Sequence, residues 1–279
     1  MVVREKHSDL IIAVCLSLTA VVNSYILLSM TRSPTYPNQQ YNHYELQRKQ
    51  ERAQEEQRNI AAGNPGDVDF IGLVRRWRKE NLQGNEPHES DADRPPRICI
   101  AVRKRPMNEK ELQQKLDHDS VTCIHPSQVW VHNAKLKVDG ITKYLDHTSF
   151  TIDYAFNEMI DTASIYQHTT LPLVNFVCQD QGRATVFAYG QTGSGKTYTM
   201  QGIQELVARD LFASIDDEQV SVSVAFFEIY GGYIQDLLNE RNKLKVLEDG
   251  KGEIVVNGLE EYEADDPDQF HGLVEKGNQ

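Results

Sequence analysis

Residues 184–200 read ATVFAYGQTGSGKTYTM, an apolar run followed by glycine, serine and threonine around one lysine. The apolar half is typical of a buried strand, and the polar half matches the pattern GxxxxGK[ST]. This pattern forms a phosphate-binding loop when it joins a strand to a helix, and the sequence predicts that arrangement here. The predicted loop consists of Gly190, Gln191, Thr192, Gly193, Ser194, Gly195, Lys196 and Thr197.

The chemistry of this loop suits a nucleoside triphosphate. Its glycines adopt backbone angles that other residues avoid, so that successive N–H groups can turn inward on phosphate oxygens. The helix that follows adds about half a positive charge at its first turn. We expect Lys196 to reach the β- and γ-phosphates and the Thr197 hydroxyl to bind Mg²⁺. The alternative interpretation is a glycine turn with an incidental lysine.

Strands and helices alternate from about Arg97 onward. The patterns predict strands over 97–103, 149–156, 184–190 and 220–230, a helix over 162–181 and a hairpin over 244–256. Such alternation is typical of an α/β layered domain. The sequence therefore predicts an α/β fold of the P-loop NTPase class, with a sheet flanked by helices.

Charge and cysteine content exclude several classes of protein. The net charge of −12 argues against general nucleic-acid binding, and nearly all of it comes from residues 216–279, which carry 16 acidic and 5 basic residues. The cysteines are far apart and favour free thiols over disulfides or a zinc site. They are Cys15, Cys99, Cys123 and Cys178. The nine histidines show no metal-binding spacing.

Residues 10–30 follow a short flank, residues 1–9, and carry no charge. As a helix they would rise about 31 Å, which matches the core of a bilayer. Two interpretations remain open. The stretch is a transmembrane segment that holds the chain at a membrane, or it is a cleaved signal peptide, although no small-x-small cleavage site follows it.

Residues 31–96 predict a linker and a helical, partly basic neck. After a polar linker at 31–43, residues 44–62 are rich in helix formers and lack an apolar stripe, which favours a solvated helix over a coiled-coil seam. Residues 67–80 predict an amphipathic helix, with a basic cluster RRWRK at 75–79. Its expected apolar side holds Phe70, Leu73, Val74 and Trp77. Residues 81–96 read as a flexible linker.

Three motifs in order resemble the kinesin motor domain: RICIAVRKRP at 97–106, FAYGQTGSGKTYTM at 187–200, and VAFFEIY at 224–230 followed by IQDLL. The resemblance covers about 97–279 and implies ATP and Mg²⁺ as cofactors, tubulin or microtubules as partner, and a place in the cytoplasm on the microtubule cytoskeleton. It also implies that Arg103, Pro106 and Tyr198 sandwich the adenine, since their flat faces stack on a heterocycle.

The stretch KLKVDGITKYL at 135–145 resembles the tubulin-contacting loop of internal-motor kinesins that depolymerise microtubules, related to mitotic centromere-associated kinesin. That resemblance assigns Lys137, Val138 and Asp139 to tubulin contact. Gly140 departs from the family pattern as an insertion, which bears on the stiffness of the loop. The basic neck fits the same group, because tubulin is acidic.

Kinesins hydrolyse ATP with a serine-serine-arginine switch and a DxxGxE switch, and the 279 residues contain neither. The resemblance therefore implies a motor domain that is incomplete at its C-terminal end, with no catalytic residue in this chain. The chain is then a fragment, a truncated gene model or a decayed paralogue. The alternative function is a non-catalytic module that binds nucleotide or a partner. An unrelated P-loop kinase or GTPase is disfavoured, because the RxRP and FFEIY stretches would then be coincidences. The oligomeric state stays open.

Overall fold

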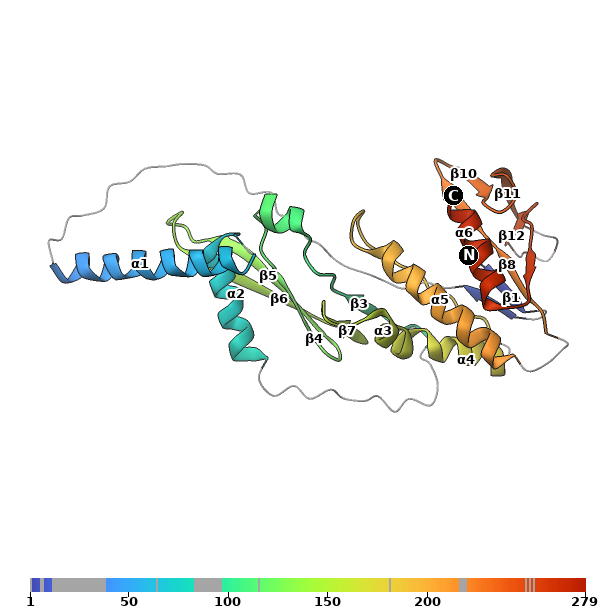
Figure 1. The fold of residues 1–279 in the computed structure, drawn as a ribbon, viewed down its shortest axis with the longest axis horizontal. Coiled ribbons are helices and arrows are strands. Elements are labelled where there is room, and N and C mark those ends of the chain that lie inside the picture. The colour runs from blue at the N-terminus through green and yellow to red at the C-terminus, as the bar shows by residue number, and fades with distance from the viewer. Residues whose placement is uncertain are drawn as a thin grey trace. The chain divides into compact units, whose positions relative to one another are not determined.

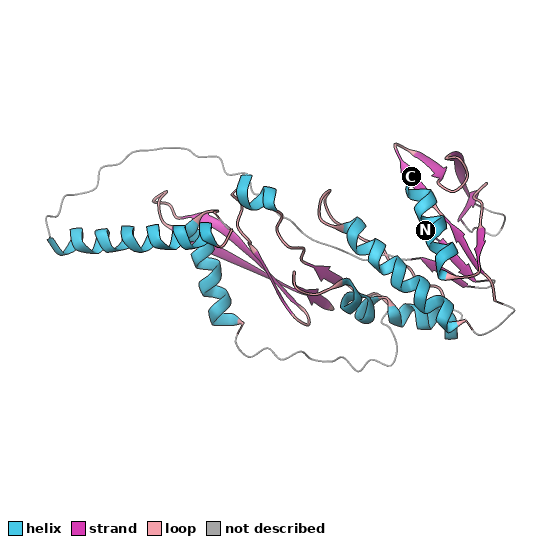
Figure 2. Ribbon diagram, in the orientation of Figure 1, coloured by secondary structure: helices cyan, strands magenta, loops and turns pink. Residues whose placement is uncertain are grey.

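The structure, a computed structural model, describes residues 2–5, 8–11, 39–63, 65–82, 97–114, 116–180, 182–215, 220–248, 250, 252 and 254–279. The chain divides into two compact units (Figure 1, Figure 2). The neck–hairpin unit comprises residues 18–88 and 102–159, and the loop–helix unit comprises residues 1–17, 89–101 and 160–279. Residues 97–279, which the sequence groups into one domain, are thus shared between both units.

The neck–hairpin unit is built on an antiparallel sheet in the order β4-β5-β6, with a smaller pair of β3 and β7. Helix α2 packs against β6, and α1 contacts α2. The elements are α1 (Gln39–Ala61), α2 (Val68–Asn81), β3 (Ala101–Arg103), the single-turn helix η1 (Lys110–Gln114), β4 (Val121–Ile124), β5 (Gln128–Leu136), β6 (Lys143–Thr151) and β7 (Tyr154–Phe156).

Helix α2 confirms the amphipathic helix expected over 67–80. Asp67 caps it, because its side chain accepts hydrogen bonds from the backbone N–H groups of Asp69 (3.0 Å) and Phe70 (3.2 Å). The expected apolar side is confirmed in part, because one of its four residues is buried and the other three are half-buried. The buried residues of the helix are Val68, Ile71 and Val74. Phe70, Leu73 and Trp77, which were expected on the same side as Val74, are half-buried.

The loop–helix unit contains two antiparallel sheets, in the orders β13-β8-β1-β2 and β12-β11-β10-β9. Its strands are β1 (Val2–Glu5), β2 (Ser8–Ile11), β8 (Val222–Ala225), β9 (Phe227–Tyr230), β10 (Tyr233–Asp236), β11 (Asn242–Glu248), β12 (Ile254–Asn257) and β13 (Tyr262–Ala264). The pairing of β11 with β12 confirms the hairpin expected over 244–256.

The described part of this unit also contains four helices: α3 (Thr162–Thr169), α4 (Leu171–Asp180), α5 (Lys196–Ser214) and α6 (Pro267–Asn278). Helix α5 packs against α3, α4 and α6. Its residues Ile203, Val207 and Leu211 are fully or almost fully buried, in one core with Val224 of β8 and Phe270 of α6. The helix that follows the glycine loop is therefore fixed along its length by apolar packing.

The prediction of a strand over 184–190 is wrong in detail, because the structure has only isolated bridges at Ala184 and Tyr189. Burial still alternates, with Val186 buried and Phe187 exposed. Among the described residues no strand pairs with the intervening positions, and a strand needs a hydrogen-bonded neighbour to form a ladder. The strand expected over 97–103 is likewise reduced to β3.

Three other expectations differ in their boundaries. The helix expected over 162–181 is two helices, because Pro172 has no N–H group to continue the first one. The strand expected over 149–156 is divided between β6 and β7. The strand expected over 220–230 is divided between β8 and β9.

The structure describes only part of the N-terminal region for which the sequence makes predictions. Leu10 and Ile11 of the apolar stretch 10–30 lie in strand β2, and residues 12–30 lie outside the described residues. Within the described ranges, no helix has the length and apolar character needed to cross a bilayer. Residues 39–43, expected as linker, form the first turn of α1, and the linker residues 83–96 fall outside the described chain.

Cys123 is a free, buried thiol, and Cys15 lies outside the described residues. Burial raises the pKa of Cys123 to about 11, which keeps its thiol protonated. The described residues contain no group of three or more His, Cys, Asp or Glu side chains placed to hold a metal ion.

Candidate functional site

The glycine loop turns directly into helix α5. Gly193 (φ 82°) and Gly195 (φ 91°) both take the left-handed conformation that glycine adopts without strain. Gly195 is the N-cap of α5, and no side chain caps the helix there. No capping side chain therefore blocks the start of the helix, as an anion-binding helix start requires.

Lys196 folds back across the loop. Its Nζ donates hydrogen bonds to the carbonyl oxygens of Gly190 (2.7 Å) and Gln191 (3.0 Å). The backbone N–H of Ser194 donates to the same Gln191 oxygen at 3.1 Å. These bonds close the predicted residues 190–197 into one compact turn, with the lysine head at its centre.

One polar atom in the loop is buried without a partner. Ser194 is 5% exposed, and its Oγ makes no hydrogen bond within the described part of the chain. Such a group costs free energy unless something satisfies it. A phosphate oxygen at this loop would supply that partner, so the residues present fit a polyphosphate.

The side chains at the end of the loop and just after it face outward from the first turn of α5. Thr197 and Tyr198 are exposed, Tyr198 by 72%. Thr199 points the other way: it is buried, and its Oγ1 donates to the carbonyl of Gly195 at 3.2 Å. The Thr197 hydroxyl expected to bind Mg²⁺ therefore lies at the accessible side of the helix start.

The other half of the expected adenine pocket lies in the neck–hairpin unit. Arg103 is half-buried in β3, and Pro106 is exposed. Between them, Arg105 forms an ion pair with Glu111 and donates to the Pro106 carbonyl at 2.9 Å. Because Tyr198 belongs to the other unit, the three-residue sandwich stays a prediction.

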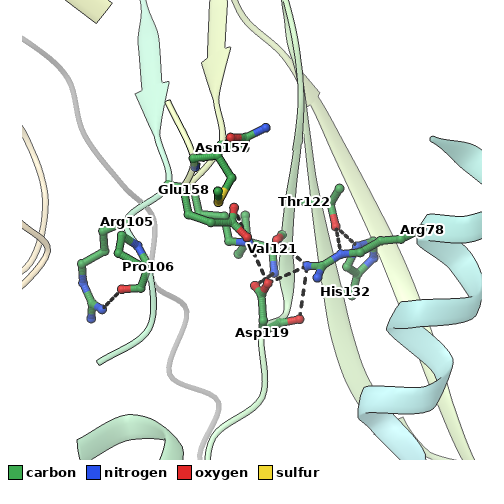
Figure 3. A network of polar contacts seen from close by, with 11 residues as sticks. Arg78, Arg105, Pro106, Asp119, Val121, Thr122, His132, Asn157 and Glu158 are labelled. Carbon is green, nitrogen blue, oxygen red and sulfur yellow. Dashed lines mark hydrogen bonds and ion pairs between the residues drawn. The ribbon is translucent and has the colours of Figure 1, made fainter. Parts of the chain in front are cut away.

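Asp119 joins the neck helix to the segment that carries Arg103 and Pro106 (Figure 3). Its carboxylate pairs with Arg78 of α2 (2.9 Å) and with Lys104 (2.6 Å), and Lys104 also pairs with Glu158 (2.9 Å). Burial alone would raise the pKa of Asp119, but the two cations outweigh it and lower that pKa below its ordinary value. The aspartate is therefore held ionised as a link between three segments.

Arg78 continues this network into the hairpin. Its guanidinium donates to the hydroxyl of Thr122 and to the carbonyl of Val121, each at 2.8 Å (Figure 3). Thr122 in turn shares a 2.8 Å hydrogen bond with Nε2 of His132 on β5. Arg78 of the basic cluster at 75–79 therefore makes its contacts within the protein, whereas Arg76 and Lys79 are exposed.

Trp77 docks α2 on the centre of the hairpin. Its ring lies 4.5 Å from that of His132, 5.0 Å from Trp130 and 5.4 Å from His147, centroid to centroid. Nearer the tip, Lys143 pairs with Asp67 and, at 2.9 Å, with Asp69. The neck helix and the hairpin are therefore joined by both aromatic packing and ion pairs.

The two histidines face each other across β5 and β6. They are register partners, and their Nδ1 atoms are 2.8 Å apart. Burial, then His147 and Arg78, lower the pKa of His132 to about 4, so its imidazole is neutral near pH 7. Spacing along the sequence indicates no role for these histidines, because only the hairpin register brings them together.

The tip of the hairpin spans residues 137–142 and is tightly closed. The N–H of Lys137 donates to the carbonyl of Thr142 (2.8 Å), and the N–H of Gly140 donates to that of Lys137 (2.9 Å). Gly140 has φ 68°, a left-handed angle that suits glycine. Val138 is fully exposed and Ile141 is 82% exposed. The tip therefore presents apolar side chains to solvent.

An α/β chain in which a glycine loop opens a buried helix has the architecture of P-loop proteins. Comparison of the chain with known protein families identifies a more specific class. The family model described as the kinesin motor domain matches residues 103–279. This chain therefore belongs to the kinesin motor-domain family, as the three sequence motifs predict.

Among similar proteins, diatom spindle kinesin-1 of Cylindrotheca fusiformis is 53% identical over 238 residues, which cover 84% of this chain and 38% of that protein. A solved fast kinesin matches with a TM-score of 0.57 and 28% identity, covering 65% of this chain and 52% of that one. A KIF14 dimer, with AMP-PNP and in complex with a microtubule, matches with a TM-score of 0.54 and 26% identity, covering 65% and 53%. The chain thus spans about half or less of the proteins it matches.

Proposed function

We propose that this chain is the ATP-binding part of a microtubule motor. The observation that carries the proposal is the loop 190–197, which opens a buried helix within a region that matches the kinesin motor domain. A bound ATP would place its phosphates against the N–H groups at the start of α5. Lys196 would exchange its two carbonyl partners for phosphate oxygens, and the Ser194 hydroxyl would gain the partner it lacks.

Mg²⁺ would be held by the Thr197 hydroxyl and by the phosphates, and it would neutralise charge on the β- and γ-phosphates. The adenine would stack against Tyr198, with Arg103 and Pro106 on its other side. The family match and the exposed position of Thr197 and Tyr198 on α5 support both cofactors, ATP and Mg²⁺. Hydrolysis would need groups beyond these, since the 279 residues hold no serine-serine-arginine or DxxGxE pattern.

The partner we propose is tubulin, which also places the protein on microtubules in the cytoplasm. The KIF14 structure that this chain resembles is in complex with a microtubule. The hairpin tip would make the contact through Lys137, Val138 and Asp139, and an intact form would use ATP to shorten microtubules. The exposed Val138 and the stiff, well-paired hairpin behind it support this finer proposal.

A triple alanine variant at Lys137, Val138 and Asp139 tests this assignment. In a full-length form it should keep its basal ATPase rate and lose microtubule shortening, because the phosphate loop is untouched and the tip is removed. The measurement is the length of stabilised microtubules over time, beside phosphate release without microtubules. Continued shortening at the normal rate would contradict the assignment of the tip.

A further inference from the structure

The carboxylate of Asp139 accepts hydrogen bonds from other residues of the hairpin tip. Its Oδ1 accepts hydrogen bonds from the backbone N–H groups of Ile141 (2.9 Å) and Thr142 (2.8 Å). Its Oδ2 accepts one from the hydroxyl of Thr142 at 2.5 Å. Both oxygens are thus engaged by the chain's own donors, and hydrogen bonds to an ionised acceptor are the strong kind.

These bonds determine the shape of the tip. They span the turn from Asp139 to Thr142 and hold Gly140 in its left-handed conformation. The residues at either side of the brace, Val138 and Ile141, project into solvent with exposures of 108% and 82%. Two large apolar side chains at one turn are costly to leave in water, and a turn without the brace would not hold them in fixed positions.

We propose that Asp139 is a positioning residue rather than a contact residue, and that it braces the tip so that Val138 and Ile141 together form its tubulin-binding element. This inference rests on the proposed function, and it adds Ile141 to the contact. It also changes the role that the family resemblance assigns to Asp139. The hydrogen bonds from Thr142 and then from the backbone lower the pKa of Asp139 to about 2, so the brace stays charged throughout the physiological range.

Two substitutions at Asp139 separate bracing from charge recognition. Asp139→Asn keeps an oxygen for the two backbone N–H groups and can donate its amide to the Thr142 oxygen, but it removes the charge. Asp139→Ala removes both. A brace predicts that the asparagine variant behaves like the wild type and the alanine variant does not, whereas a direct charge contact predicts that both variants fail.

The first readout is hydrogen exchange at the tip of the 279-residue chain. Asp139→Ala should speed exchange of the Ile141 and Thr142 amides by about tenfold, because each loses its acceptor. Asp139→Asn should leave both rates within about twofold of the wild type. Thr142→Val, which removes one donor and keeps the shape, should give a smaller rise than the alanine variant. Unchanged exchange in Asp139→Ala would overturn the brace.

The second readout is binding of soluble tubulin dimers, followed by fluorescence anisotropy of labelled chain. Val138→Ser and Ile141→Ser should each weaken binding by about tenfold, since each loses a buried apolar contact. Both should leave hydrogen exchange at the tip unchanged. Full binding by Ile141→Ser would remove that residue from the contact and contradict the proposed pair.

The two readouts together distinguish the possible failures. If Asp139→Asn keeps the tip rigid but loses tubulin, the partner reads the charge and the positioning role is wrong. If the wild-type chain itself does not bind tubulin, the proposed function fails, and with it the role of the apolar pair. Hydrogen exchange would in that case still decide whether Asp139 braces the turn.

Discussion

His132 shows how one side chain can tie stability to pH. It is fully buried, and it faces His147, Arg78, Lys104 and Asp119. Its hydrogen bond to His147 joins two Nδ1 atoms, so one of them must be unprotonated. An unfolded imidazole takes up a proton near pH 6.5, whereas the pKa of folded His132 is about 4. Between these values the unfolded state binds more protons, so stability rises with pH.

The protein should therefore lose stability as the pH falls from 7.5 to 5, by about 2 kcal/mol from His132 alone. Urea unfolding at several pH values measures this loss. His132→Gln should flatten the pH dependence, even if it lowers stability at pH 7.5. His168→Gln, a change at an exposed histidine of α3, should leave the slope as it is. A slope that His132→Gln does not alter would show that other groups carry the pH dependence.

Asp119 is the second residue whose removal has a predictable cost. Its side chain is 23% exposed and pairs with Arg78 and Lys104. Asp119→Asn should lower the free energy of unfolding by about 2 kcal/mol, because Arg78 loses its counter-ion and Lys104 keeps only Glu158. Asp146→Asn is the matched control, since Asp146 pairs with Lys135 on the exposed side of the same hairpin. That change should cost less than about 1 kcal/mol. Equal losses in both variants would contradict the linking role of Asp119.

At the scale of elements, helix α6 contains a glycine that packing requires. A methyl group on Gly277 would lie 2.2 Å from Cδ1 of Phe226, whereas one on Gly272 of the same helix would meet nothing within 4 Å. Gly277→Ala should therefore destabilise the protein by about 1–3 kcal/mol through overpacking. Gly272→Ala should stabilise it by up to about 1 kcal/mol, because alanine favours helix. Thermal unfolding checks both signs, and a stabilising Gly277→Ala would contradict this packing of α6.

The elements that local pattern predicts well are those whose stability is local. Asp67 caps α2 from within its own turn, and β11 and β12 are adjacent along the chain, so both are readable from short stretches. The run 184–190 is different, since a strand depends on a neighbour that local sequence does not specify. Burial still alternates along this run, although no hydrogen-bonded ladder to a neighbouring strand is present among the described residues.

The same distinction between local and long-range contacts decides which parts of the candidate site the sequence predicts. The eight residues of the glycine loop are contiguous, so the motif locates them without knowledge of the fold. The network around Asp119 joins α2, the β3 segment and β4, and no spacing in the sequence predicts that meeting. The hydrogen bonds of Asp139 are local, yet a turn with several polar residues allows many bonding patterns, and the sequence does not show which one forms.

At the scale of the whole molecule, the family match from residue 103 to 279 covers parts of both compact units. The candidate nucleotide groups are divided in the same way, with the loop in one unit and Arg103 and Pro106 in the other. The acidic residues are concentrated in 216–279, away in sequence from the basic neck. Nucleotide binding is the property that the loop alone should confer, and the proposed motor function depends on it.

Binding of a fluorescent ATP analogue to the 279-residue chain in the presence of Mg²⁺ measures this property. The wild type should bind, and Lys196→Ala should weaken binding by about 100-fold, because a charge-assisted contact to the phosphates is lost. Lys245→Ala, at an exposed lysine of β11, should bind as the wild type does. Circular dichroism should confirm that all three chains are folded. Undiminished binding by a folded Lys196→Ala chain would contradict the phosphate-loop assignment and the motor function built on it.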